Sequence, residues 1–282
     1  MVYLYSYLEA EPSVLAMKGV VVSLPTVSII GSPVTALPFE AQIGTIANWA
    51  KARLSKVVCV ANVHMLVEAY WHGDFGSVLR KADIVTPDGM PLVWMIRLFG
   101  FKNQDRVAGL DILTGVCNLA QSAGVSVYFL GPQPDVLARM QAKLRKDFPM
   151  LSIAGMESLP FRQSIEVDQA LIDRVNASGA GIVLIALGCP KQEHWMAMHQ
   201  NKINAVMIGL GGAFLVYAGI HKRAPRWARE NGLEWLYRLI QEPRRLWRRY
   251  ALTIPPFLYL ALKQIFLAPR SPELANGQAQ SK

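Results

Sequence analysis

Four short apolar runs constrain the fold of this chain more than any other feature. They read KVVCVAN, VSVYFLG, AGIVLIALG and NAVMIGLGG. Each run is rich in β-branched residues and adjoins an amphipathic segment of helical length. Continuous apolar strands of this kind lie in parallel sheets that helices cover on both faces. We therefore predict an α/β fold with a mainly parallel sheet and flanking helices over residues 38–54, 109–123, 134–147, 166–177 and 190–200.

The composition allows one large domain or a domain with an appendage. The chain has 282 residues, of which 52% are hydrophobic, so a large core can be buried. Its three cysteines are widely spaced and lack a CxxC pattern, which favours a reducing compartment and argues against structural zinc. Glu9 and Glu11 stand where a secretory signal would carry basic residues. We therefore expect a cytoplasmic protein.

Three glycine-containing turns follow the predicted strands, in FLGPQPDV, ALGCPKQEHW and IGLGGAFL. Ligands of parallel sheets bind at the carboxyl ends of the strands, where helix N-termini attract anions. Tight packing is the simpler explanation of each turn alone, but together they indicate a ligand that carries phosphate. The broken glycine fingerprint disfavours a nicotinamide oxidoreductase. The candidate ligand-binding residues in these turns are Gly131, Lys191, Gln192, Gly211 and Gly212.

The chain contains no Asp-x-Asp pair, which many nucleotide-sugar enzymes use to hold a divalent cation on a diphosphate. A bound diphosphate would then have to be neutralised by arginine, lysine and backbone amides. We expect neither a metal ion nor a cofactor.

Asp88 stands between a proline and a glycine in KADIVTPDGMPLVW. Aspartate is a preferred N-cap residue, and the apolar stretch from Met90 to Leu98 has the length of a helix that Asp88 could cap. The same carboxylate could instead do chemistry, and the residues themselves leave both roles open.

The C-terminal third is unusually basic. Residues 221–250 contain nine basic and three acidic residues, so six of the chain's nine net positive charges lie there. Aromatic residues are interleaved at helical spacing, which is typical of a helix on anionic lipid and also of a nucleic-acid surface. A solvated basic face is the alternative that charge alone would favour. The apolar stretch after Tyr250 is interrupted by Pro255 and Pro256 and carries Lys263, so we expect that it does not span a membrane.

Seven segments in this order resemble the WecG/TagA/CpsF family, glycosyltransferase family 26, over roughly residues 27–257. They are VANVHMLVEA, ADIVTPDGMPLVW, DRVAGLDIL, VYFLGPQPDV, VLIALGCPKQEHWM, MIGLGGAF and KRAPRWARENGLEWLYRLIQEPRRLWRRY. The resemblance implies a Rossmann-like core with a basic helical C-terminal appendage. It also implies inverting, metal-independent transfer from a UDP-sugar to a polyprenyl-diphosphate-linked sugar at the cytoplasmic face of the bacterial inner membrane.

The resemblance also implies roles for particular residues. Asp88 matches the proposed base, Arg106 an arginine that acts on diphosphate charge, and Gln192 a polar residue of the nucleotide-sugar site, which Asn62 also lines. A helix N-terminus beside Asp88 would tend to lower its pKa. Many family members read Thr-x-Asn where this chain has Val60, so a contact made by that hydroxyl cannot be carried over. Arg223 or Arg226 is expected at the diphosphate, and the expected membrane contacts are Arg244, Arg245, Arg248, Arg249, Trp227, Trp235 and Trp247.

We therefore expect four parts: a loose extension over 1–24, the glycosyltransferase core over 25–220, the membrane-associating appendage over 221–268 and a tail over 269–282. The transferred sugar is glucose, N-acetylmannosamine or N-acetylmannosaminuronic acid, in exopolysaccharide or cell-surface glycan synthesis. Nucleic acid is not an expected partner, and a homo-oligomer is left open. The alternative function is a non-catalytic basic module that binds membrane or nucleic acid, and a shift of melting temperature by UDP distinguishes the two.

Overall fold

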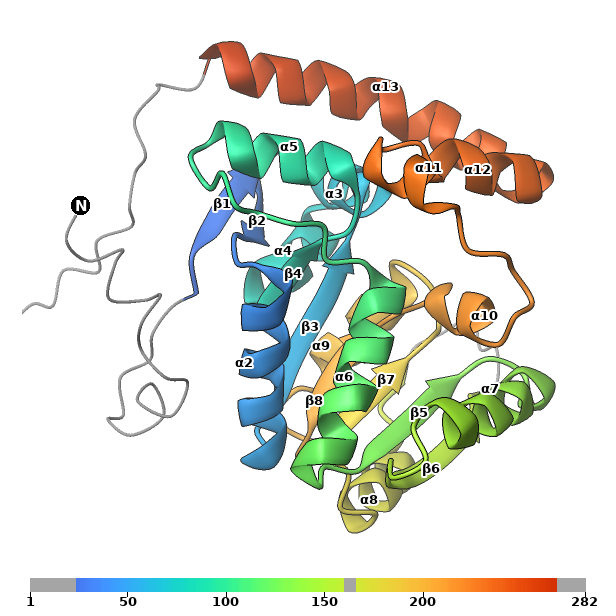
Figure 1. Ribbon diagram of the computed structural model, residues 1–282. Coiled ribbons are helices and arrows are strands. Elements are labelled where there is room, and N and C mark those ends of the chain that lie inside the picture. Colours follow the sequence, from blue (N-terminus) through green and yellow to red (C-terminus); the bar gives the residue numbers. More distant parts are fainter. Residues whose placement is uncertain (1–23, 160–165, 268–282) are drawn as a thin grey trace, which may run out of the picture.

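The computed structural model describes residues 24–159 and 166–267 (Figure 1). The expected loose extension, apart from Leu24, and the expected tail lie outside the described residues.

The body of the protein is a six-stranded parallel sheet with the strand order β4-β3-β8-β7-β5-β6. In β3, Val58 and Val60 belong to one apolar core, while Cys59 and Ala61 belong to the other. Successive side chains of a strand point to opposite faces, so a strand buried on both faces is apolar throughout. The strands are β3 (Lys56–Ala61), β4 (Ile84–Pro87), β5 (Val127–Gly131), β6 (Ile153–Ser158), β7 (Ile182–Ile185) and β8 (Val206–Gly209).

Helices cover both faces of this sheet (Figure 1). One face carries α2 (Phe39–Lys51), α6 (Gly109–Ala123), α7 (Pro134–Asp147) and α10 (Ala213–Tyr217). The other carries α3 (Val63–Trp71), α4 (Gly73–Lys81), α8 (Gln169–Ala177) and α9 (Lys191–His199). The predicted Rossmann-like α/β class and its five helices are thereby confirmed.

Three further elements flank the sheet near β4. A short antiparallel hairpin joins β1 (Thr26–Ile29) to β2 (Ser32–Thr35), and α5 (Met90–Leu98) follows β4. The hairpin and the edge strand β6 were not predicted from the sequence. Every residue of β6 is half-buried and Gly155 lies within it, so it lacks the continuous apolar run of the central strands.

The appendage consists of α11 (Arg226–Glu230), α12 (Glu234–Gln241) and α13 (Pro243–Leu267). In Figure 1 these helices lie across the edge of the sheet at which the strands end. Phe257 and Ala261 of α13 are buried in the same apolar core as α3, and Gln264 hydrogen-bonds Ile30 N and Ser28 O of the hairpin. The appendage is therefore packed against the body through the C-terminal half of α13.

The two prolines of the apolar stretch do not end the last helix, because α13 runs through Pro255 and Pro256 without a break. Burial of Phe257 and Ala261 just beyond them holds the helix together, and such packing can outweigh the lost backbone hydrogen bonds. By length and composition, α13 is the one helix in the described part of the chain that could span a membrane, although one of its faces is packed on the body.

Candidate active site

Asp88 lies at the end of β4, where its backbone N–H donates to Ala61 O of the neighbouring strand at 2.7 Å. The residue at the N-cap of α5 is Gly89, with a φ of 131°, and the cap makes no side-chain hydrogen bond. The N-cap interpretation of Asp88 is therefore wrong. The carboxylate instead accepts a hydrogen bond from the Gly109 N–H at the start of α6.

Arg106 connects Asp88 to two other acids. Its Nη1 lies 3.9 Å from Asp88 Oδ1 and contacts Glu234 Oε2 of α12, while its Nη2 lies 3.5 Å from Asp111 Oδ2. Asp111 also binds Arg223 of the appendage. Three carboxylates from three elements thus surround one guanidinium.

The surroundings raise the pKa of Asp88 to about 6. Burial is the largest cause and the nearby negative charge of Glu234 adds to it, whereas Arg106, Arg238 and the Gly109 N–H act in the opposite direction. The expected lowering of the pKa by a helix N-terminus is present at the Gly109 N–H of α6, but desolvation and Glu234 outweigh it.

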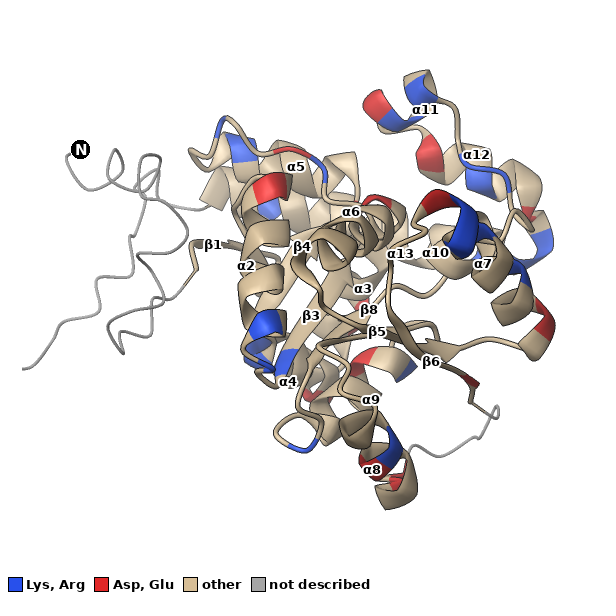
Figure 2. Ribbon diagram, turned by 60° about the horizontal axis from the view of Figure 1, so that its bottom comes forward, with Lys and Arg blue, Asp and Glu red and all other residues tan. Residues whose placement is uncertain are grey.

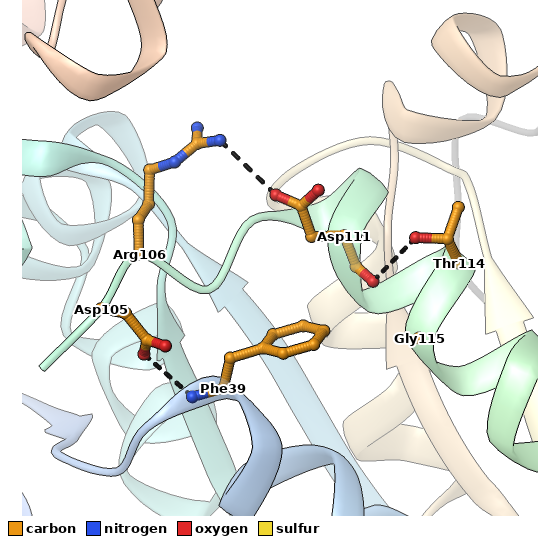
Figure 3. A pocket seen from close by; sticks show the side chains of 6 residues that line it. All are labelled: Phe39, Asp105, Arg106, Asp111, Thr114 and Gly115. Carbon is orange, nitrogen blue, oxygen red and sulfur yellow. Dashed lines mark hydrogen bonds and ion pairs between the residues drawn. The ribbon is translucent and has the colours of Figure 1, made fainter. Parts of the chain in front are cut away.

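An open pocket of about 320 Å³ adjoins Arg106 (Figure 3). It lies between the N-terminal turns of α2 and α6, with the ring of Phe39 on one side and Thr114 on the other. A Cβ on Gly115 would lie 2.8 Å from Phe39 Cζ, so a larger residue at this position would force the Phe39 ring to move. The pocket is lined by Phe39, Asp105, Arg106, Asp111, Thr114 and Gly115.

Gln192 lies in the first turn of α9 with only 4% of its surface exposed. Its Oε1 accepts from Gly188 N at 3.2 Å and its Nε2 donates to Glu193 Oε1 at 2.8 Å. A Cβ on Gly209 or Gly211 would lie 2.9 and 3.3 Å from this amide, so the glycine turn after β8 packs directly on it. The alternative of an exposed first-turn side chain is excluded.

Glu193, next to Gln192, is fully buried, and burial raises the pKa of its carboxyl to about 7. The hydrogen bond from Gln192 lowers this pKa but does not offset the burial. Its Oε2 has no hydrogen-bond partner among the described residues. His64 Nδ1 and Arg249 Nε likewise lack one, and burial together with Arg249 lowers the pKa of His64 to about 3. A small set of buried polar atoms therefore lies beneath α13.

The remaining core candidates have local partners. Asn62 caps α3 by accepting from Met65 N at 3.2 Å, and Val60 is a core residue with 6% exposure. Gly131 ends β5, where a Cβ would lie 3.0 Å from Ala186 Cβ, so close strand packing requires glycine there. Lys191 is the half-buried first residue of α9.

The appendage arginines divide into two groups. In the first group, Arg223 binds Asp111, and Arg238 lies close to Gly212, where a Cβ would be 3.2 Å from its Nη2. Arg249, in α13, is half-buried. Arg226 and Arg245 bind Glu230 and Glu242 of the appendage, and Arg226, Arg244, Arg245 and Arg248 are exposed. Figure 2 shows both basic and acidic segments on α11 and α12.

Three tryptophans were expected on the membrane side of the appendage. Trp227 and Trp247 are 61% and 59% exposed, whereas Trp235, at 38%, packs edge-on against Tyr250 with ring centroids 5.8 Å apart. Sequence reasoning did not place Glu234 and Arg238 in the site. Their i,i+4 spacing in one helix was the available signal that both side chains share a face.

Among the described residues, no group of three or more His, Cys, Asp and Glu side chains could hold a metal ion.

A parallel α/β sheet with Asp88 and Arg106 at its carboxyl edge places the chain in the class of Rossmann-like proteins, whose ligands bind at that edge. Residues 27–271 match the Glycosyl transferase WecG/TagA/CpsF family, and the chain belongs to it. It is therefore a glycosyltransferase.

Two characterised relatives carry the same name, N-acetylglucosaminyldiphosphoundecaprenol N-acetyl-β-D-mannosaminyltransferase. The one from Bacillus spizizenii strain W23 is 35% identical over 207 residues, which cover 73% of this chain and 78% of the relative. The one from Bacillus subtilis strain 168 is 31% identical over 219 residues, which cover 77% of this chain and 83% of the relative.

Proposed function

We propose that this enzyme transfers a sugar from a UDP-sugar, with inversion and without a metal ion, to a polyprenyl-diphosphate-linked sugar. N-acetylmannosamine is the first candidate for the transferred sugar, because both relatives are named for it, and their acceptor carries N-acetylglucosamine. The observation that carries the proposal is Asp88, a carboxylate with a pKa raised to about 6 at the carboxyl edge of the sheet.

In this mechanism Asp88 accepts the proton of an acceptor hydroxyl as that oxygen attacks the anomeric carbon of the donor. The bond from that carbon to the diphosphate breaks, and its electrons leave with UDP. A base works best when its pKa lies near the working pH, which favours a carboxyl whose pKa is raised. Arg106 lies 3.9 Å from Asp88 and also lines the open pocket, so we assign the acceptor sugar to the neighbourhood of this guanidinium.

The leaving diphosphate needs positive charge. Arg106 is surrounded by three carboxylates, so further cations are required. Arg238 lies against the glycine turn after β8, and Arg223 and Arg249 also face the body. We assign the diphosphate to these appendage arginines and to the N-terminal amides of α9.

The outer side of the appendage suits a peripheral position on the cytoplasmic face of the membrane. Trp227, Trp247 and Phe266 are exposed there together with basic residues, and aromatic and basic side chains anchor helices at anionic interfaces. The packing of one face of α13 against the body favours this surface position over a span.

The test is release of UDP from a panel of UDP-sugars, with and without an N-acetylglucosaminyl-diphosphate-lipid acceptor. We expect acceptor-dependent release with UDP-N-acetylmannosamine and a product of inverted anomeric configuration by NMR. No transfer with any UDP-sugar, and no shift of the melting temperature by UDP, would leave the non-catalytic binding module as the better proposal.

A further inference from the structure

Glu234, from the appendage, reaches the centre of the site on the body. It is the first residue of α12, and its Oε2 accepts from Arg106 Nη1. On one side, the turn at Gly232 packs on α5, where a Cβ would lie 3.0 Å from Trp94 and 3.2 Å from Met90. On the other, Trp235 packs on Tyr250 of α13. Packed groups before and after Glu234 therefore fix where its carboxylate lies.

Arg106 Nη1 faces two carboxylates but hydrogen-bonds only one. Asp88 Oδ1 lies 3.9 Å away, beyond hydrogen-bond range, whereas Glu234 is in contact. Charge-assisted hydrogen bonds are strongest at short distance, and the carboxylate that makes one with Arg106 Nη1 is Glu234 rather than Asp88. The contact with Glu234 thus leaves the oxygens of Asp88 without a direct bond to Arg106.

We propose that Glu234 is a positioning residue for the base: by holding Arg106, it keeps Asp88 out of a direct salt bridge and able to accept the proton of the acceptor hydroxyl. The inference rests on the proposed function. It means that the base is complete only when α12 is docked on the body, so that the appendage takes part in proton transfer as well as in binding.

The charged groups that face Asp88 come from three elements. Glu234 and Arg238 approach from α12, Arg106 from the loop before α6, and the Gly109 N–H from α6, with Asp111 on the far side of Arg106. Glu234 is the acid among them that raises the pKa of Asp88. Without it, the opposing cations remain, so the pKa falls.

The experiment is the pH dependence of kcat for wild type and Glu234→Gln, with the full chain, UDP-N-acetylmannosamine and the lipid-linked acceptor. In the variant, Arg106 pairs with Asp88, so the acid limb of the profile moves to lower pH. At pH 8, kcat falls about tenfold, because a less basic carboxylate is a weaker general base. UDP still raises the melting temperature, since the nucleotide site is intact.

Glu230→Gln is the matched control. It removes the same charge from the same appendage, but Glu230 is exposed and pairs with Arg226, whose side chain is 84% exposed. We expect a wild-type profile. Glu234→Asp retains the charge, so the acid limb of its profile should stay close to that of wild type. This second variant distinguishes loss of the charge from misfolding of Glu234→Gln.

An unchanged acid limb in Glu234→Gln, or the same downward shift in Glu234→Asp, would overturn the inference. So would a rise in kcat with a lower KM for the donor, because that result would mean that Glu234 competes with the diphosphate for Arg106. A wild-type enzyme that transfers no sugar would overturn the proposed function instead.

Discussion

The inner and outer sides of the appendage are built from the same residue types but have different environments. On the inner side, Glu234 and Arg223 bind groups of the body, and Arg249 is half-buried. On the outer side, Trp247 and Arg248 are exposed. A basic and aromatic composition therefore does not by itself identify a membrane surface, because some of these residues contact the body instead.

Helical geometry separates the two sides. Arg248 and Arg249 are adjacent in the sequence, but successive residues of a helix are rotated by about 100°, and one is exposed while the other has a buried Nε. The inner side should act on chemistry and stability, and the outer side on attachment to lipid. Each of the following experiments tests one side of that division.

The largest effect is expected from Asp88→Asn, which removes the proposed base beside the inner side of the appendage. Transfer should fall by ~10²–10⁴, the usual contribution of a general base. The fold should persist, because Asp88 makes no helix cap. The measurements are kcat and the melting temperature with and without UDP. Asp74→Asn, at an exposed position in α4, is the control. Near-normal turnover in Asp88→Asn would remove the reason for calling this side catalytic.

The second comparison sets Phe257 against Phe266, two phenylalanines of α13. Phe257 is 3% exposed and Phe266 is 81% exposed. Phe257→Ala should lower the free energy of unfolding by about 3–5 kcal/mol, as for other buried aromatics, and Phe266→Ala by less than about 0.5 kcal/mol. Denaturant titration measures both. Equal effects would mean that α13 is not docked on the body in solution.

This packing changes what truncation should do. The sequence alone predicts that deletion from Lys222 onward leaves a more soluble core, but α13 contributes Phe257 and Ala261 to the core beside α3. Deletion would expose that apolar surface to water. The single substitutions in α13 are therefore the cleaner test.

The outer side is tested by replacing Arg226, Arg244 and Arg248 with glutamate. Each basic residue near anionic lipid contributes ~1 kcal/mol, so affinity for anionic vesicles should fall by about a hundredfold or more. High salt should weaken binding of the wild type in the same direction. Co-sedimentation with anionic and neutral vesicles is the measurement.

The same charge change on α7, at Arg139, Arg145 and Lys146, is the control, because these residues are exposed on a helix of the body. That variant should bind vesicles as wild type does. Equal loss in both variants would show that net charge matters and the outer side does not. Extraction of the wild type only by detergent would instead favour a membrane span for α13.

The parts that the sequence could predict are those that local pattern determines. The central strands and the helices 109–123 and 134–147 follow from apolar runs and periodicity, and α5 over Met90–Leu98 has the predicted bounds. The cap role of Asp88 failed because Gly89 is the N-cap residue of α5 and the Asp88 carboxylate accepts from Gly109 of α6 instead. The contact between Arg106 and Glu234 joins residues 128 positions apart, and only the docking of α12 creates it.

The smallest expected effect is that of chelation. Exhaustive treatment with EDTA should leave the transfer rate unchanged within error, because arginines rather than a metal ion are assigned to the diphosphate. The chain has no Asp-x-Asp pair, and the acids closest to the site, Asp88, Asp111 and Glu234, are each already faced by Arg106. A cation placed among them would have to displace that guanidinium.

Loss of activity on chelation with recovery on adding magnesium or manganese would contradict this assignment, and Arg238→Gln would then have little effect. If the assignment holds, Arg238→Gln should raise the KM for the UDP-sugar while EDTA does nothing, which ties the diphosphate to the inner side of the appendage.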